Sequence, residues 1–267
     1  MSKEQKFDYD GDAPDGRVTL VGAGPGAVDL LTIRGQRVLT QADVVVYDDL
    51  ANVELLEFCP PEAKRIYVGK RAGVHYVPQE ETCRILIEEA KKGLHVVRLK
   101  GGDPLVFGRG GEEIAALAAE GIACAVVPGV TAAIAAGASI GVPLTHREHA
   151  SAVVFVTGHE CAGKRPEQAT VDWAALAKTG ATLCIYMGVR RLPEISEKLQ
   201  AGGLSGTTPV AVVANATLPT QTLHVTNLAA APLLSESLKG QPALIIVGEV
   251  VRWAELQQTM AALQLAQ

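Results

Sequence analysis

Residues 22–27, with the sequence GAGPGA, stand between the apolar run RVTLV and the segment DLLTIRGQRVL. Gly22, Gly24 and Ala27 match the pattern G-x-G-x-x-G/A of dinucleotide-binding loops, in which glycines let the backbone approach a pyrophosphate. Asp48 ends the next apolar run, VVVYD, at about the distance where such sites place an acid against the ribose. The pattern is equally compatible with another ligand or with a plain tight turn.

A second glycine-rich segment, KGGDPLVFGRGGEE at residues 100–113, follows the apolar run HVVRL. Five glycines within eleven residues exceed what a turn requires and indicate backbone held against a ligand or another loop. Asp103 is predicted at the carboxyl end of a strand, where open α/β sheets bind ligands. Glu112 and Glu113 are interpreted as acids that stabilise the start of a helix.

A third loop, PGVTAA at residues 128–133, also joins a predicted strand to a predicted helix. Thr131 can cap this helix or contact a ligand. A dinucleotide fingerprint needs only the first of the three loops, so their combination argues against a simple nicotinamide or flavin site.

Short runs rich in Val, Ile and Leu alternate with helix-like segments, which predicts an α/β fold. Residues 17–145 are expected to form an N-terminal domain with a mainly parallel sheet, and residues 146–267 a C-terminal domain with a mixed sheet. Residues 1–16 are polar and predict a disordered tail without a signal peptide. Residues 78–93 carry the start signal, apolar spacing and final glycine of an amphipathic helix.

Composition limits the classes of partner. The chain has 267 residues, a formal net charge of −5 and five cysteines without metal-ligand spacing. The charge gives no general attraction to nucleic acid or to an acidic membrane. Residues 121–145 lack charges, but their prolines, glycines and alanines argue against a membrane span. A cytoplasmic protein with reduced thiols and no metal is expected.

Together these motifs resemble the tetrapyrrole methylase family, whose members use S-adenosylmethionine (SAM). The resemblance covers about residues 17–253 and rests on the strings VTLVGAGPG, VVVYDDL, VGKRAG, VPQEE, RLKGGDPLVFGRGGEE, VVPGVTAA, GVPLTHR, VTGH and YMG. It implies two α/β domains with the active site in the cleft between them, and a homodimer. The implied reaction is methylation of uroporphyrinogen III at C2 and C7, giving precorrin-2 for siroheme or cobalamin.

The resemblance also implies which residues contact SAM, namely those matching the family's glycine loops, the T-A pair, the YMG methionine and a later strand loop. In this sequence they are Pro25, Gly101, Gly102, Asp103, Val106, Thr131, Ala132, Met187 and Ala216. The family usually has a glycine where Ala216 stands, and a backbone contact survives the added methyl group if φ is negative.

The implied proton acceptor is Asp48 and the implied proton donor is Lys70, with a structural or carboxylate-pairing lysine as the alternative. A proton must leave the macrocycle after its carbon attacks the methyl group, and a positioned carboxylate suits that task. The eight substrate carboxylates require local positive charge. Candidate contacts, each of which is about as compatible with a surface ion pair, are Arg71, Lys100, Arg109, His146 and Arg147.

Three other functions stay open at this stage. One is methylation of a later corrin precursor by the same type of enzyme. The others are an NAD(P)-dependent oxidoreductase and a non-catalytic tetrapyrrole-binding protein. An oxidoreductase would bind nucleotide through residues 22–27 alone and would leave the other glycine-rich loops without a task.

Overall fold

A computed structural model describes residues 17–69, 77–159 and 170–254. The expected tail at 1–16 lies outside the described residues, as do Lys70 and Arg71. The chain forms two compact units, one containing residues up to 24 and 28–129, the other containing 25–27 and residues from 130 onward. The division therefore falls before the third loop's helix, whereas the sequence places it near residue 145.

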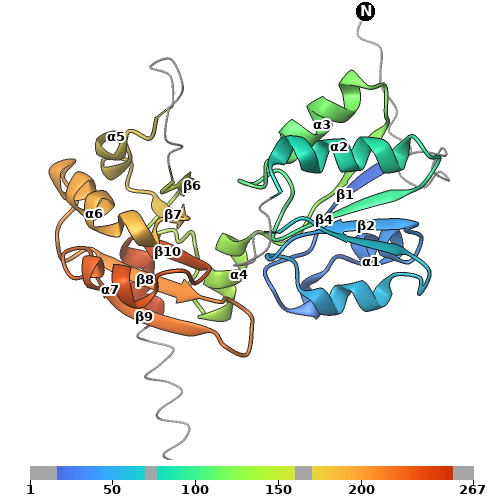
Figure 1. Ribbon diagram of the computed structural model, residues 1–267. Coiled ribbons are helices and arrows are strands. Elements are labelled where there is room, and N and C mark those ends of the chain that lie inside the picture. The colour runs from blue at the N-terminus through green and yellow to red at the C-terminus, as the bar shows by residue number, and fades with distance from the viewer. Residues whose placement is uncertain (1–16, 70–76, 160–169, 255–267) are drawn as a thin grey trace, which may run out of the picture. The chain divides into compact units, whose positions relative to one another are not determined.

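The sheet of unit 1 has five strands, all parallel, as the apolar runs predict (Figure 1). Its spatial order is β3-β2-β4-β1-β5. Parallel neighbours bring all their carboxyl ends to one edge, so the loops that follow them meet there. The strands are β1 (Val18–Gly22), β2 (Val44–Tyr47), β3 (Lys64–Tyr67), β4 (Val96–Lys100) and β5 (Cys124–Val127).

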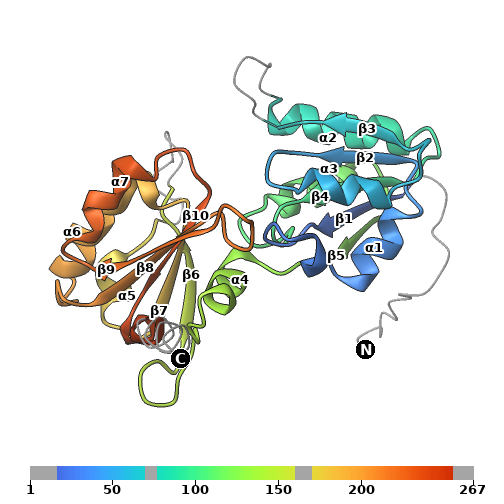
Figure 2. The same cartoon turned by 90° about the horizontal axis from the view of Figure 1, so that it is seen from below.

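Helical segments cover both faces of this sheet (Figure 2). Buried Leu86 and Leu117, from α2 (Gln79–Ala90) and α3 (Gly110–Ala119), pack with residues of one sheet face such as Leu20. The other face packs against α1 (Ile33–Leu39) and the 3-10 segment η2 (Val53–Phe58). The inner strands β1, β2 and β4 are consequently buried on both faces and are apolar except for Thr19, Arg98 and Lys100.

The sheet of unit 2 is mixed, as predicted. Its order is β6-β7-β10-β8-β9, in which only the β6 and β7 pair is parallel. The last strand in sequence thus lies at the centre of the sheet. The strands are β6 (Val153–Thr157), β7 (Thr182–Tyr186), β8 (Pro209–Ala214), β9 (Thr222–Asn227) and β10 (Ala243–Val247).

The helix α4 (Ala132–Ser139) explains why the boundary between the units lies earlier in the chain than the sequence predicts. Its buried residues Ala133 and Ala136 pack with Ala211 and Leu244 of the unit 2 sheet. Small side chains let the helix approach that sheet closely, so α4 belongs to unit 2 although it follows the last strand of unit 1. The opposite face of the sheet is covered by α5 (Trp173–Ala177), α6 (Leu192–Ala201), α7 (Leu234–Ser237) and the 3-10 segment η4 (Ala231–Leu233).

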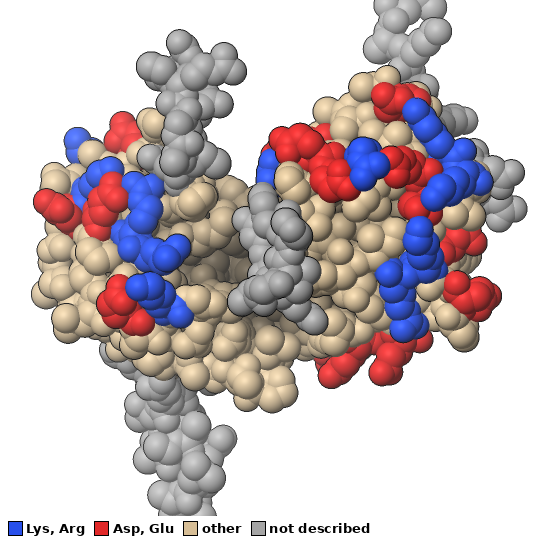
Figure 3. Space-filling model, in the orientation of Figure 1, with Lys and Arg blue, Asp and Glu red and all other residues tan. Residues whose placement is uncertain are grey.

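Charges on the surface lie intermixed. On the face shown in Figure 3, blue and red side chains alternate over the outer helices. Arg84 of α2, for example, pairs with both Glu81 and Glu88. Within the described residues no helix is both long and apolar enough to cross a bilayer.

The four cysteines in the described part of the chain are free thiols. Burial raises the pKa of Cys124 to about 11 and that of Cys184 to about 12. Thiols held so far above neutral pH are poor nucleophiles and poor metal ligands. The fifth, Cys161, lies outside the described residues.

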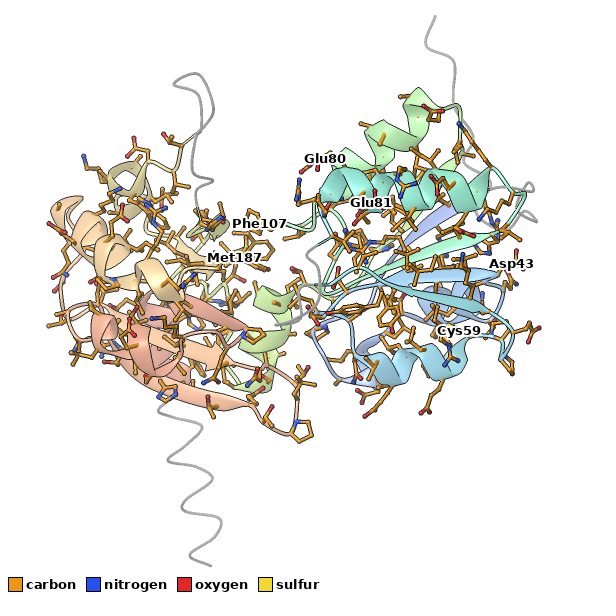
Figure 4. All side chains as sticks on the ribbon, viewed as in Figure 1. Asp43, Cys59, Glu80, Glu81, Phe107 and Met187 are labelled. Carbon is orange, nitrogen blue, oxygen red and sulfur yellow. The ribbon has the colours of Figure 1, made fainter. Side chains whose placement is uncertain are left out.

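His95, just before β4, links three segments at the amino-terminal edge of the unit 1 sheet. Its Nδ1 lies 2.9 Å from the Gln41 carbonyl oxygen, and its Nε2 lies 3.1 Å from Thr19 Oγ1. A carbonyl oxygen can only accept, so Nδ1 carries the hydrogen and the neutral Nε2 accepts from the threonine hydroxyl. Asp43, labelled in Figure 4, accepts from the His95 backbone N–H at 2.8 Å. The neutral ring is therefore built into the sheet edge.

Protonation of His95 should destabilise the fold. Burial lowers the pKa of His95, against the opposing effect of the Gln41 hydrogen bond. The unfolded chain therefore takes up this proton first, and stability present above about pH 6.5 is lost as the pH falls towards the depressed folded pKa. One proton gives a slope of at most about 1.4 kcal/mol per pH unit. His95→Gln should reduce the slope of the unfolding free energy against pH, measured by urea unfolding at a series of pH values below about 6.5.

Exposed His159 provides the matched control. His159→Gln should keep the wild-type slope of unfolding free energy against pH. An unchanged slope in His95→Gln would show that another group carries the acid sensitivity.

Candidate functional site

Three glycine loops pack backbone against backbone at the carboxyl edge of the unit 1 sheet. Gly24 and Gly102 exchange hydrogen bonds, with N···O distances of 3.2 and 2.6 Å. A Cβ added at Gly129 would lie 2.2 Å from the Gly102 oxygen, and one added at Gly22 would lie 2.5 Å from the Gly129 Cα. The second loop thus holds both other loops, which confirms the expectation of backbone held against another loop.

Asp103 ties two of these loops together through its side chain. Its Oδ1 accepts from Leu105 N at 2.8 Å and its Oδ2 accepts from Gly129 N at 3.1 Å. Both carboxylate oxygens are therefore engaged in shaping the loops.

The first loop is not built as a pyrophosphate cradle. Ala23 N donates to the Lys100 carbonyl at 2.7 Å, Gly24 N donates to Gly102, and Ala27 N donates to Thr217 Oγ1 at 3.0 Å. The helix that should follow directly begins only at Ile33, after a 3-10 turn. A dinucleotide site needs free N–H groups and the N-terminus of an α-helix at the loop, whereas these three N–H groups are hydrogen bonded and α1 does not begin at the loop.

Asp48 lies immediately after β2, beside the second loop. Its Oδ2 is 2.6 Å from Arg98 Nη2, and its Oδ1 accepts from Leu50 N at 3.1 Å. The side chain is 24% exposed, so it is fixed in position and still accessible. A Cβ on Gly101 would lie 2.5 Å from Leu50 Cβ, which shows how closely the second loop covers the Asp48 turn.

The adjacent Asp49 is occupied differently. It accepts a short hydrogen bond from the Tyr67 hydroxyl, and the Tyr67 ring meets Tyr47 edge to face at 5.6 Å. The two neighbouring carboxylates are thus separated, each with its own donor.

Arg98 and Glu113 are the site residues that the sequence interpretation misses. Glu113 is fully buried and pairs with Lys100 and Arg98, so it is not a surface acid at a helix start. Glu112 is the exposed one, and it pairs with Arg109. A usable signal was present, because Arg98 and Lys100 alternate on an otherwise apolar inner strand, and buried cations require a buried acid.

In unit 2, the predicted ligand residues lie at the start of α4 and in the loops that follow β7 and β8. Thr131 Oγ1 lies 2.7 Å from Tyr186 Oη, which also accepts from Ala133 N at 3.0 Å. Tyr186, and not Thr131, therefore satisfies a free N–H of α4, whose first residue is Ala132. Thr131 makes no side-chain cap of its own.

Met187 and the loop after β8 have unusual backbone conformations. Met187, which is labelled in Figure 4, has φ of 54° and is 53% exposed. Asn215 and Thr217, on either side of Ala216, have φ of 50° and 70°. Left-handed backbone at residues other than glycine is costly and concentrates at functional sites. Ala216 itself has no left-handed φ, consistent with a backbone contact there.

The remaining SAM candidates divide between the two units. Gly101, Gly102 and Val106 are half-buried residues of unit 1, whereas half-buried Pro25 counts with unit 2. All are small or apolar residues with partly accessible backbone.

The predicted substrate contacts have different environments. Lys100 is 4% exposed and donates to Glu113 at 3.0 Å, a position that does not favour direct contact with a substrate carboxylate. Arg109 is exposed, with φ of 59°, and forms a bidentate pair with Glu112. Arg147 is exposed in the turn that precedes β6.

His146 lies in that same turn, in a cluster with Glu148 and His149 whose ligand atoms all fall within 4.8 Å of one another. The two rings stack at 24°, so their nitrogen lone pairs run side by side and do not converge on one point. Nδ1 of His146 already accepts from Glu148 N at 3.2 Å. This geometry does not favour a metal.

Comparison with known proteins gives one family. A model described as Tetrapyrrole (Corrin/Porphyrin) Methylases matches residues 17–232. Siroheme synthase 1 of Serratia proteamaculans (strain 568) is 51% identical over 247 residues, covering 92% of this chain and 51% of that protein. Siroheme synthase 1 of Yersinia pseudotuberculosis serotype I (strain IP32953) is 52% identical over 236 residues, covering 88% and 49%. The chain thus spans about half the length of the curated relatives it matches.

Solved structures of similar length also match. Uroporphyrin III C-methyl transferase from Thermus thermophilus is 38% identical, with a TM-score of 0.75 over 88% of this chain and 93% of that chain. A second structure of that enzyme, complexed with S-adenyl homocysteine, matches equally well. Cobalt precorrin-4 methyltransferase, a cobalamin biosynthetic enzyme, is 30% identical, with a TM-score of 0.78 over 90% and 99%.

Proposed function

Because the chain belongs to the tetrapyrrole (corrin/porphyrin) methylase family, we propose that it methylates uroporphyrinogen III at C2 and then C7, using two SAM molecules. The product is precorrin-2, which is a precursor of siroheme and cobalamin, and precorrin-1 is the intermediate. The similarity to the Thermus thermophilus enzyme along most of both chains favours this early substrate.

One observation carries the proposal: a partly exposed carboxylate, Asp48, is held in position beside the glycine-rich loops at the carboxyl edge of the unit 1 sheet. SAM supplies the methyl group. As the substrate carbon forms its new bond to that methyl group and the bond to sulfur breaks, Asp48 accepts the proton that the macrocycle must release. The remaining rate enhancement comes from alignment of the substrate carbon with the methyl group, and rigid loops help to maintain that alignment.

For SAM, we propose contacts from the exposed Met187 and from the backbone of the second loop and of Ala216. Pro25, Val106, Thr131 and Ala132 add small or apolar surface. The bound S-adenyl homocysteine of the Thermus thermophilus structure supports this choice of methyl donor.

For the substrate carboxylates, we propose exposed Arg109 and Arg147 and half-buried His146. Guanidinium groups bind carboxylates in a fork geometry. Lys70 as proton donor and Arg71 as carboxylate partner remain proposals, since both lie outside the described residues.

The direct test is incubation with enzymatically prepared uroporphyrinogen III and methyl-labelled SAM, followed by mass analysis of the tetrapyrrole. We expect transfer of two methyl groups, inhibited by added S-adenosylhomocysteine. Absence of label in the tetrapyrrole, with SAM still bound, would reject this substrate.

The similarity to cobalt precorrin-4 methyltransferase supports a second candidate, methylation of a later corrin precursor. A parallel reaction with such a precursor separates the two. Label in the later precursor alone would replace our proposal, and label in neither, with SAM bound, would favour a non-catalytic tetrapyrrole-binding protein.

An oxidoreductase is disfavoured by the first loop, because its N–H groups are already hydrogen bonded within the protein. Titration with NADH and NADPH should show no saturable binding. We also propose a homodimer, as in the family, which light scattering of the eluting protein would check.

A further inference from the structure

A chain of charged side chains runs through unit 1 from α3 to Asp48. It begins at Glu113, which is completely buried. Oε1 of Glu113 accepts from Lys100 Nζ at 3.0 Å, Gln79 Nε2 at 3.0 Å and Arg98 Nε at 3.3 Å. Three donors, one from helix α2 and two from strand β4, therefore converge on one oxygen, while buried Oε2 has no hydrogen-bond partner in the described part of the chain.

Arg98 is the next member of the chain and is almost completely buried. Its Nη1 donates to the carbonyl oxygens of Leu99 at 2.9 Å and Val46 at 3.4 Å, and its Nη2 donates to Asp48 Oδ2 at 2.6 Å. Each nitrogen of the guanidinium group is engaged. A planar fork held at Glu113, at the backbone and at Asp48 leaves the side chain little freedom to move.

The charges in this chain balance. Two cations, Arg98 and Lys100, accompany two carboxylates, Asp48 and Glu113. Burial and the neighbouring Arg98 lower the pKa of Lys100, and Glu113 opposes that change. Glu113 is the buried carboxylate that both cations share, and without it only Asp48 would oppose their two positive charges.

Asp48 is the last member of this chain of charged side chains, and Arg98 is the member that contacts it. Arg98 holds Oδ2, and Leu50 N holds Oδ1 from the turn itself. These two hydrogen bonds set the carboxylate plane while part of the group stays accessible to a reacting partner.

We infer that Arg98 is a positioning residue that presents the Asp48 carboxylate to the reacting proton, and that Glu113 is the buried anchor that keeps Arg98 in place. The inference rests on the proposed role of Asp48 as proton acceptor. Neither Arg98 nor Glu113 needs to touch the substrate; both act through the carboxylate.

The chain offers well-matched variants for a test. Glu113→Gln keeps the shape, places the amide oxygen at the Oε1 position and removes only the charge. Arg98→Lys keeps the charge and removes the fork, whereas Arg98→Gln removes both. Exposed Arg84 on α2 is the control, and Arg84→Gln should leave turnover at the wild-type level.

We expect kcat for label transfer to fall about 100-fold in Arg98→Gln and about tenfold in Arg98→Lys and in Glu113→Gln, since misplacement by about 1 Å costs on this order. KM for SAM and affinity for S-adenosylhomocysteine should stay within about twofold, because Arg98 and Glu113 act through the Asp48 carboxylate and contact no ligand.

A double-mutant comparison separates positioning from general damage. In an Asp48→Asn background, Arg98→Gln and Glu113→Gln should change the residual rate by less than about threefold, because the residue they act through is gone. An equal loss in both backgrounds would overturn the inference. Full activity of Asp48→Asn alone would instead reject the proposed role of Asp48.

A crystal structure of Glu113→Gln gives a readout that needs no activity. We expect Arg98 to move away from Asp48 and the Asp48 carboxylate to change orientation. If the Arg98–Asp48 pair persists unchanged, Glu113 is not its anchor. If Arg98→Gln does not fold, Arg98→Lys and Glu113→Gln carry the same comparison.

Discussion

Asp48→Asn is expected to lose at least about 100-fold in turnover while binding S-adenosylhomocysteine as the wild type does, since a general base contributes about 10²–10⁴-fold. The amide keeps the shape of the carboxylate, but its single oxygen can accept from only one of the two donors, Leu50 N and Arg98, that bind the two carboxylate oxygens of Asp48. It cannot take up the proton that the macrocycle releases. Single-turnover transfer of labelled methyl measures the chemical step, and calorimetric titration measures the binding.

Asp49→Asn is the matched control, because it removes the same charge one residue away. Asp49 is hydrogen bonded to the Tyr67 hydroxyl, whereas Arg98 pairs with Asp48. We expect it to retain most of the wild-type rate. An equal loss in both variants would assign the effect to overall negative charge, and a fully active Asp48→Asn would remove Asp48 from the mechanism.

The predicted parallel and mixed sheets are both confirmed. Their inner strands come from apolar runs of the sequence that are buried on both faces. RVTLVG and HVVRLK become the neighbouring strands β1 and β4, which have no exposed side to mark with alternation. Strand order could not be predicted in the same way. Nothing local in PALIIVG specifies that β10 is inserted between β7 and β8, since that follows from packing of the whole unit.

The domain division shows where local patterns mislead. The alanine-rich helix α4 follows the last strand of unit 1 without a polar linker, so the sequence places it there. Its partners, Ala211 and Leu244, lie far along the chain in β8 and β10. Small side chains carry little amphipathic signal, and only the tertiary contacts identify the sheet that the helix covers.

The candidate site residues stay predictions from sequence motifs, whereas the supporting charges are found only in the structure. Asp48 and the glycine-rich loops are visible in the sequence because their residue types are unusual at strand ends. Glu113 looked like an ordinary acid in the first turn of a helix, where most such acids are solvated. Its burial depends on how α3 lies against β4, which brings Arg98 and Lys100 to it.

Gly129→Ala is expected to lower the unfolding midpoint of unit 1 by about 6–12 °C, equivalent to about 3 kcal/mol at 2–4 °C per kcal/mol. The added Cβ would lie 2.2 Å from the Gly102 oxygen and 2.8 Å from the Gly22 Cα. These are backbone atoms, so no side-chain rotation can relieve the clash, and the hydrogen bonds between Gly24 and Gly102 would have to open.

Gly111→Ala isolates this effect, because the same methyl group is added in the first turn of α3 with nothing within 4 Å of it. Both variants lose the same backbone freedom in the unfolded chain, and Gly111→Ala should therefore be neutral or stabilising by up to about 1 kcal/mol. The difference between the two midpoints, measured by circular dichroism, reports the close packing of the loops alone. Equal midpoints would mean that the loops separate easily, and a rigid frame for Asp48 would then have to come from Arg98 and Glu113 without them.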